Sequence, residues 1–120
     1  MPYFFDTYAL VEIINGNRNY SGFSDEKIIV SMLNIGELYL VNLREIGKEY
    51  AYNLIKKFKF QVLEISQDVV IDAMNFKNKH NKREFSWPDC IGYALSRKHK
   101  LKFLTGDRQF EDMENVEFVK

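Results

Sequence analysis

Short apolar runs alternate with longer amphipathic segments along this chain of 120 residues. Runs of apolar, β-branched and aromatic residues predict strands, and they cover residues 3–5, 27–32, 60–65, 101–105 and 116–119. Helical spacing predicts helices in the intervening segments, at about 7–14, 34–46, 49–58, 67–79 and 87–99. Strands separated by helices favour a parallel sheet covered on both faces. The pattern therefore predicts an α/β fold, a three-layer α/β/α sandwich with a central parallel sheet.

Two helix starts carry specific capping signals. Asn34 is followed three residues later by Glu37, the spacing of a capping box, so we expect a helix to open at Asn34. Ser86 is followed by Pro88 and then by Asp89, again three residues after the cap. These signals place Glu37 and Asp89 near the beginnings of two helices.

Composition and charge narrow the class of protein. The hydrophobic content of 46% is sufficient for a core, and the absence of a Pro-, Gly- or Ser-rich linker predicts one domain spanning residues 1–120. Seventeen basic residues balance seventeen acidic residues, so no overall field attracts a polyanion. Any nucleic acid must therefore be bound by local groups of cations.

The cysteine content and the amino-terminal sequence predict a cytoplasmic location. The single cysteine, Cys90, cannot form an intrachain disulfide, and its apolar neighbours indicate a small core residue. The first residues have no basic region, and Asp6 and Glu12 interrupt their apolar run, so they do not resemble a signal peptide. No apolar run is long enough to span a bilayer, and we expect a soluble protein without a membrane partner.

Four acidic residues stand where apolar runs give way to helix-start sequences: Asp6, Glu37, Asp89 and Asp107. The carboxyl ends of strands in an open α/β sheet converge on one crevice, so these carboxylates are candidates for one divalent-metal site. Each also has a purely structural interpretation as a helix cap, with Asn34 or Ser86 as capping partner for two of them. The sequence leaves both interpretations open for each acid.

Further observations favour the metal site. The helical neighbours of Glu37 are Leu33, Leu40 and Val41, with no cation to compensate the carboxylate. Four clustered carboxylates repel one another unless cations are present, and an oxygen-only ligand set suits Mg²⁺ or Mn²⁺. The small residues Gly92 and Ser96 are expected to leave space beside Asp89 on its helix. The two histidines, His80 and His99, lie in basic stretches and are interpreted as surface residues rather than zinc ligands.

The ordered motifs FFDTYAL, NIGELYL, SWPDCIGYALS and TGDRQFEDMENVEFV resemble the PIN domain family, most closely its VapC-type toxins. This resemblance implies an α/β/α domain that acts as an Mg²⁺- or Mn²⁺-dependent endoribonuclease, often dimeric and held inactive by a small antitoxin protein. Asp6, Glu37, Asp89 and Asp107 match the acidic quartet of the family, and Thr105 matches its supporting hydroxyl residue. One difference is the short segment between the first helix and the second strand, a region that often helps to build the dimer and the substrate groove.

The RNA substrate requires positive charge near the acids. Lys82 and Arg83 in one loop, and Arg108 beside Asp107, are the candidate RNA-binding residues. The alternative is that these cations keep the surface solvated and interact favourably with the carboxyl-terminal ends of helix dipoles. Trp87 and Tyr93 could stack on bases, but we expect both to pack in the core.

Two other classes of protein, and a second kind of nuclease, are alternatives to this interpretation. A phosphoacceptor receiver domain normally has an acidic pair after its first strand, whereas Asp6 stands alone. A non-catalytic interaction module with the same fold would be expected to lose one or more of the acids, and all four are present. A stand-alone RNA-processing nuclease remains open, and a small open reading frame immediately upstream would distinguish a toxin from it.

Overall fold

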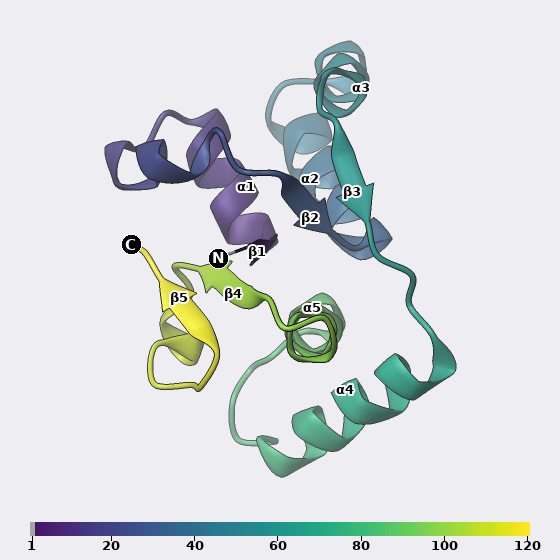
Figure 1. Cartoon of the computed structure of the whole chain (residues 1–120). Helices are drawn as coiled ribbons and strands as arrows, with labels where there is room; N and C mark the ends of the chain where they lie inside the picture. The colour runs from purple at the N-terminus through teal and green to yellow at the C-terminus, as the bar shows by residue number, and fades with distance from the viewer. Residues whose placement is uncertain (1) are drawn as a thin grey trace.

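A five-stranded parallel sheet forms the centre of the molecule, as the computed structural model of residues 2–120 shows (Figure 1). Only the first residue of the predicted 1–120 domain lies outside the described part. The strand order is β3-β2-β1-β4-β5, and every neighbouring pair is parallel. The strands are β1 (Tyr3–Phe5), β2 (Ile28–Val30), β3 (Phe60–Val62), β4 (Lys102–Thr105) and β5 (Val116–Phe118).

Helices connect these strands in chain order. The α-helices are α1 (Thr7–Ile14), α2 (Met32–Glu45), α3 (Lys48–Lys57), α4 (Gln67–Lys79) and α5 (Trp87–Lys98). Two 3-10 helices, η1 (Arg18–Phe23) and η2 (Arg108–Phe110), complete the elements. Gly47 separates α2 from α3 with φ 144°, a conformation that only glycine adopts readily. The segments predicted as helices are all helical, and α4 has the predicted bounds.

Adjacent residues of the central strands point into two different cores, as the two-residue period of a strand requires. Phe4 and Phe103 pack on one face with residues of α4 and α5. Phe5, Val30 and Leu104 pack on the other face with residues of α1 and α2. The sheet therefore has helices on both faces, which confirms the predicted α/β/α architecture (Figure 1).

The start of α2 corrects the predicted capping box. Strand β2 ends at Val30, and Ser31 is the N-cap of a helix that begins at Met32. The Asn34 side chain accepts a hydrogen bond from the Ser31 backbone N–H at 3.0 Å, so Asn34 closes the box instead of opening the helix. Glu37 consequently lies in the second turn, and its carboxylate takes no part in capping.

Packing along α5 corrects two further expectations. Gly92 does not leave open space, because a Cβ there would lie 2.8 Å from the Phe4 ring, and this glycine allows α5 to approach the sheet closely. Tyr93 is 4% exposed, as expected for a core residue, whereas Trp87 is 57% exposed, so the prediction that it packs in the core was wrong. Cys90 is fully buried, as predicted. No helix within residues 2–120 combines the length and the apolar composition needed to cross a bilayer.

Candidate metal centre

The four predicted acids line one pocket of about 370 Å³. Asp6 directly follows β1, and Asp107 follows β4 after one glycine, so both lie beyond the carboxyl ends of adjacent strands. Asp89 lies in the first turn of α5, and Glu37 reaches the pocket from α2. The topology thus brings together side chains that are as much as 101 residues apart in sequence.

The helix-cap interpretation holds for two of the four acids. Asp89 accepts a hydrogen bond from the Ser86 N–H at 3.0 Å, as the predicted capping box requires. Asp107 accepts from the Gln109 N–H at 3.0 Å at the start of η2. The side chain of Asp6 makes no capping hydrogen bond, and neither does Glu37. Capping therefore accounts for the local positions of Asp89 and Asp107 but leaves Asp6 and Glu37 unexplained.

Threonine hydroxyls hold those two remaining carboxylates. The Thr105 hydroxyl donates to Asp6 Oδ2 at 2.8 Å, and the Thr7 hydroxyl donates to Glu37 Oε1 at 2.6 Å. Thr105 is fully buried behind Asp6, in the position expected for a supporting hydroxyl. Each of the four acids in the pocket is therefore held by at least one hydrogen-bond donor of the protein.

Burial and the charges of neighbouring carboxylates disfavour the charged forms of Asp6, Glu37 and Asp89. Asp6 is 4% exposed. Its burial, and then the nearby charge of Asp89, raise its pKa to about 7, against the smaller lowering effects of the Thr105 hydroxyl and the Thr7 amide. Burial also raises the pKa values of Glu37 and Asp89. The carboxylates thus form an environment in which negative charge is unfavourable without a cation.

No side-chain cation of the described chain neutralises this charge directly. Within residues 2–120 the ion pairs are Arg83 with Asp112 and Arg108 with Glu111, and neither includes an acid of the pocket. Lys77 lowers the pKa of Asp89 through its charge, but its ammonium donates to the Phe85 carbonyl at 2.5 Å. The pocket therefore carries uncompensated negative charge.

The residues fit a hard divalent cation by their chemistry. The acids supply only carboxylate oxygens, the ligands that Mg²⁺ and Mn²⁺ prefer, and neither His80, His99 nor Cys90 lines the pocket. Among residues 2–120, no three side chains of His, Cys, Asp or Glu are close enough as placed to hold an ion together. Bringing three of these carboxylates onto one ion accordingly requires some of their side chains to move closer together.

Replacing Thr105 by valine tests the coupling between this hydroxyl and the Asp6 charge. The variant keeps the side-chain shape but removes the donor to Asp6. We expect it to lower the free energy of unfolding by about 1.5–3 kcal/mol at pH 8.5, where Asp6 is ionised, and by only about 0.5–1.5 kcal/mol at pH 5. Urea unfolding in the presence of a chelator measures both values. An equal loss at the two pH values would contradict the coupling.

Three residues of the site were not predicted as site residues from the sequence. Glu12 lines the pocket as a fifth carboxylate, and its Oε2 accepts from the Asn17 side chain at 3.0 Å. Its spacing of four residues from Tyr8, another lining residue, is the signal that could have indicated it. Thr7 and Asn34 belong to the site through hydrogen bonds between segments distant in sequence, and no local pattern could have indicated these contacts.

The three candidate RNA-binding cations lie together on the surface. Lys82, Arg83 and Arg108 line one surface pocket of about 740 Å³, and Arg108 directly follows Asp107. Arg83 is bound to both carboxylate oxygens of Asp112 at 2.9 Å and donates to the Gln109 carbonyl. Arg108 is 3.7 Å from Glu111. Contact of these cations with RNA stays a prediction. Lys82 and Arg108 are more available to bind a phosphate than Arg83, because Arg83 is already paired with Asp112.

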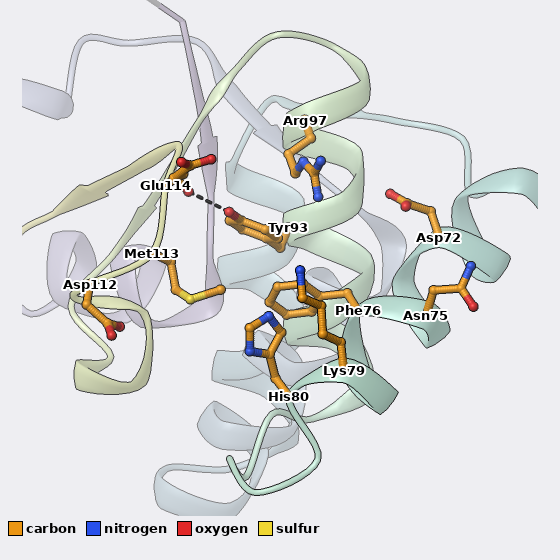
Figure 2. Close-up of a pocket in the computed structure, with 10 residues that line it drawn as sticks. All are labelled: Asp72, Asn75, Phe76, Lys79, His80, Tyr93, Arg97, Asp112, Met113 and Glu114. Carbon is orange, nitrogen blue, oxygen red and sulfur yellow. Dashed lines mark hydrogen bonds between the residues drawn. The ribbon is translucent and has the colours of Figure 1, made fainter.

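A separate pocket of about 500 Å³ lies between α4, α5 and the segment before β5 (Figure 2). The rings of Phe76 and Tyr93 contribute its apolar surface, and the Tyr93 hydroxyl donates to the Glu114 carbonyl at 2.5 Å. Three basic and three acidic side chains line it: Lys79, His80, Arg97, Asp72, Asp112 and Glu114. This balance of charge differs from the purely acidic set of the candidate metal centre.

The fold and the acidic pocket define an α/β protein with a carboxylate site at the strand ends of a parallel sheet. The PIN domain family model matches residues 3–116, and the chain therefore belongs to the PIN domain family. None of the curated protein sequences gives a significant match.

Solved structures with the same fold come from several bacteria. The VapC20 toxin of Mycobacterium tuberculosis, described as cleaving the sarcin-ricin loop, shares 20% identity with a TM-score of 0.77, covering 98% of this chain and 99% of that one. VapBC2 of Rickettsia felis, bound to promoter DNA, shares 14% identity with a TM-score of 0.76 over the whole of both chains. A toxin–antitoxin complex of Klebsiella pneumoniae shares 18% identity with a TM-score of 0.75, covering 96% and 95%. These similarities extend over nearly the full length of each compared chain and establish the shared fold.

Proposed function

We propose that residues 1–120 form a single divalent-metal-dependent endoribonuclease domain that hydrolyses RNA phosphodiester bonds. The observation that carries this proposal is the meeting of Asp6, Glu37, Asp89 and Asp107 in one pocket of a PIN domain without a side-chain cation to neutralise them. Phosphodiesters are anionic, so a pocket of carboxylates can accept one only with metal ions between them. Binding of the proposed cofactor, Mg²⁺ or Mn²⁺, would compensate this negative charge.

Each residue of the site has a defined role in this proposal. Asp6, Asp89 and Asp107 would hold the metal, with Glu37 at the rim, and Thr105 would hold Asp6 in place. When bound, a divalent cation supplies the Lewis-acid chemistry of phosphodiester hydrolysis. No side-chain nucleophile is required, and Cys90 is unsuited to that role because burial raises the pKa of its thiol to about 11.

We further propose that the protein is the cytoplasmic toxin of a type II toxin–antitoxin pair, acts as a homodimer and is inhibited by a small antitoxin protein. The support is its structural similarity to a protein described as a toxin–antitoxin complex, to the VapC20 toxin and to three VapBC structures. The alternative of a stand-alone RNA-processing nuclease shares the same site and the same chemistry. An upstream open reading frame whose product co-purifies with this protein would favour the toxin.

Cleavage of RNA by the protein and its Asp89→Asn variant tests the nuclease. The amide oxygen of asparagine can still accept the hydrogen bond from the Ser86 N–H, so the variant should keep the capping box of α5 while losing the charge of one proposed metal ligand. We expect the wild-type protein to cut a structured RNA with Mg²⁺ or Mn²⁺, and the variant to lose this activity. The measurement is gel analysis of the products beside samples containing a chelator.

The variant also controls for contaminating ribonuclease, because a contaminant would purify equally with both proteins. Cleavage that resists the chelator, or that is equal in the two proteins, would contradict the proposed site. Absence of cleavage on a broad panel of RNAs, with no binding of metal by the wild type, would favour a non-catalytic interaction module.

Reversing the charges of Lys82 and Arg108 tests the proposed path of the RNA. Replacing both by glutamate in the inactive Asp89→Asn background should weaken RNA binding and reduce the salt dependence of log Kd by about 0.7 for each lost phosphate contact. Fluorescence anisotropy at several salt concentrations measures this slope. The matched control reverses Lys57 and Lys59, exposed residues before β3 and thus at the opposite end of the sheet. Equal effects in the two double variants would show only a general loss of positive charge.

A further inference from the structure

We propose that Thr7 and Asn34 are positioning residues that fix the carboxylate of Glu37 for the metal, through a chain of hydrogen bonds with a single allowed direction. The inference rests on the proposed function of the same site and extends it to two residues outside the acidic quartet. The chain links the start of α1 to the first two turns of α2.

Four hydrogen bonds make up the chain. The Ser31 backbone N–H and hydroxyl both donate to Asn34 Oδ1, at 3.0 and 2.8 Å. Asn34 Nδ2 donates to Thr7 Oγ1 at 3.1 Å, and Thr7 Oγ1 donates to Glu37 Oε1 at 2.6 Å. Ser31 and Asn34 are fully buried, so water does not compete for these groups.

The direction of the chain follows from its first donor. A backbone N–H can only donate, so the atom of Asn34 that faces Ser31 must be the oxygen. The amide NH₂ of Asn34 then faces Thr7, whose hydroxyl oxygen must accept. The Thr7 proton is therefore left to point at Glu37, and Glu37 Oε1 must be an acceptor. The other oxygen of Glu37, Oε2, takes no part in these hydrogen bonds and is available to a metal.

A second chain of the same kind holds Asp6. The Asp107 backbone N–H donates to Thr105 Oγ1 at 3.1 Å, and Thr105 Oγ1 donates to Asp6 Oδ2 at 2.8 Å. In both series of hydrogen bonds a backbone N–H fixes the direction, and a threonine hydroxyl donates a hydrogen bond to one oxygen of a carboxylate in the pocket. Thr7 thus does for Glu37 what Thr105 does for Asp6, and the site has two supporting hydroxyls.

Binding of Mn²⁺ to the metal-free protein tests the role of Thr7. Thr7→Val keeps the branched shape and removes the hydroxyl, whereas Thr7→Ser keeps the hydroxyl. We expect Thr7→Val to raise the Kd for Mn²⁺ by about 10-fold or more, as loss of a partner of a metal ligand typically does, and Thr7→Ser to restore binding to near the wild-type value. Electron paramagnetic resonance of free Mn²⁺ measures the Kd without any enzymatic assay.

Asn34→Asp tests the direction of the chain. This nearly isosteric change keeps the acceptor for Ser31 but turns the second atom into an acceptor, so the Thr7 proton is drawn away from Glu37. We expect Mn²⁺ binding to weaken at least as much as in Thr7→Val. The matched control is Asn42→Asp, because Asn42 is also a buried asparagine of α2, donates to the Leu38 carbonyl and does not line the pocket. That control places a buried charge in the same helix and should leave Mn²⁺ affinity nearly unchanged in the folded protein.

The outcomes separate this inference from the proposed function. Wild-type affinity in Thr7→Val, or equal weakening in Thr7→Val and Thr7→Ser, overturns the positioning role while leaving the metal site intact. Equal weakening in Asn34→Asp and Asn42→Asp overturns the direction of the chain. Failure of the wild-type protein to bind Mn²⁺ overturns the proposed function, and the positioning role with it.

Discussion

Asp6→Asn is expected to stabilise the metal-free protein at neutral and alkaline pH while abolishing metal-dependent cleavage of RNA. Burial raises the pKa of Asp6 to about 7 from an ordinary value of 3.8. Protonated Asp6 therefore favours the folded state, and this contribution to stability is present below about pH 4 and is lost as the pH rises through 7. Asparagine is always neutral and avoids that loss.

The rise of the pKa from 3.8 to about 7 corresponds to at most about 4 kcal/mol of unfolding free energy above pH 7. We expect the free energy of unfolding of Asp6→Asn to exceed that of the wild type at pH 8 by a fraction of this upper limit. The difference should disappear near pH 4. Urea unfolding in a chelator across this range measures it. The control is Asp25→Asn, which replaces an exposed carboxylate in a turn that does not line the pocket and should leave the stability at pH 8 nearly unchanged.

Metal should reverse the order of stability. A ligand that binds only the folded state stabilises it by about 2.7 kcal/mol at 100 times its Kd, and only the wild type is expected to gain this. Cleavage should fall in Asp6→Asn by more than the roughly 10–100-fold typical of outer partners of a metal ligand. A variant that is destabilised in the chelator at pH 8, or that still responds to metal like the wild type, would show that Asp6 has a structural role instead.

The sequence predicted the layers of the fold because both faces of the sheet depend on local patterns. Phe4 and Phe5 are adjacent apolar residues, and a strand covered on both sides requires such a run. The strand lengths were less predictable, since residues 27–32 are apolar or β-branched at most positions while β2 pairs only from Ile28 to Val30. The strand pairing ends at Val30, because Ser31 is the N-cap of α2 instead of a further strand residue.

The candidate site shows the same limit. Asp6, Glu37, Asp89 and Asp107 could be selected because each stands at a recognisable junction, and the topology then brings them to one pocket. The capping box was assigned to Asn34 and Glu37 because their spacing satisfies the rule, but Ser31 and Asn34 satisfy it equally well. In the structure the Ser31 N–H donates to Asn34 Oδ1, and the Asn34 amide also donates to Thr7, 27 positions away in the sequence. Hydrogen bonds between distant segments leave no periodic signal in a single sequence.

Gly106→Ala is expected to be the most damaging of the small substitutions in the site. Gly106 lies between Thr105 and Asp107, and a Cβ there would be 2.4 Å from the Val119 carbonyl oxygen and 2.3 Å from the Tyr8 ring. The carbonyl belongs to backbone that is itself fixed, because the Val119 N–H donates to the Thr105 carbonyl at 2.9 Å. The strain cannot be relieved by turning one side chain.

We therefore expect Gly106→Ala to lower the free energy of unfolding by about 1–3 kcal/mol or more. It should also weaken metal binding, because the same backbone carries both Thr105 and Asp107. Thermal unfolding with and without Mn²⁺ measures both effects. The matched control is Gly36→Ala, one residue before Glu37 in α2, where a Cβ meets nothing within 4 Å. That change should stabilise the helix by about 0.5–1 kcal/mol. An unchanged free energy of unfolding in Gly106→Ala would refute the close packing of the Thr105–Asp107 turn against Tyr8 and Val119.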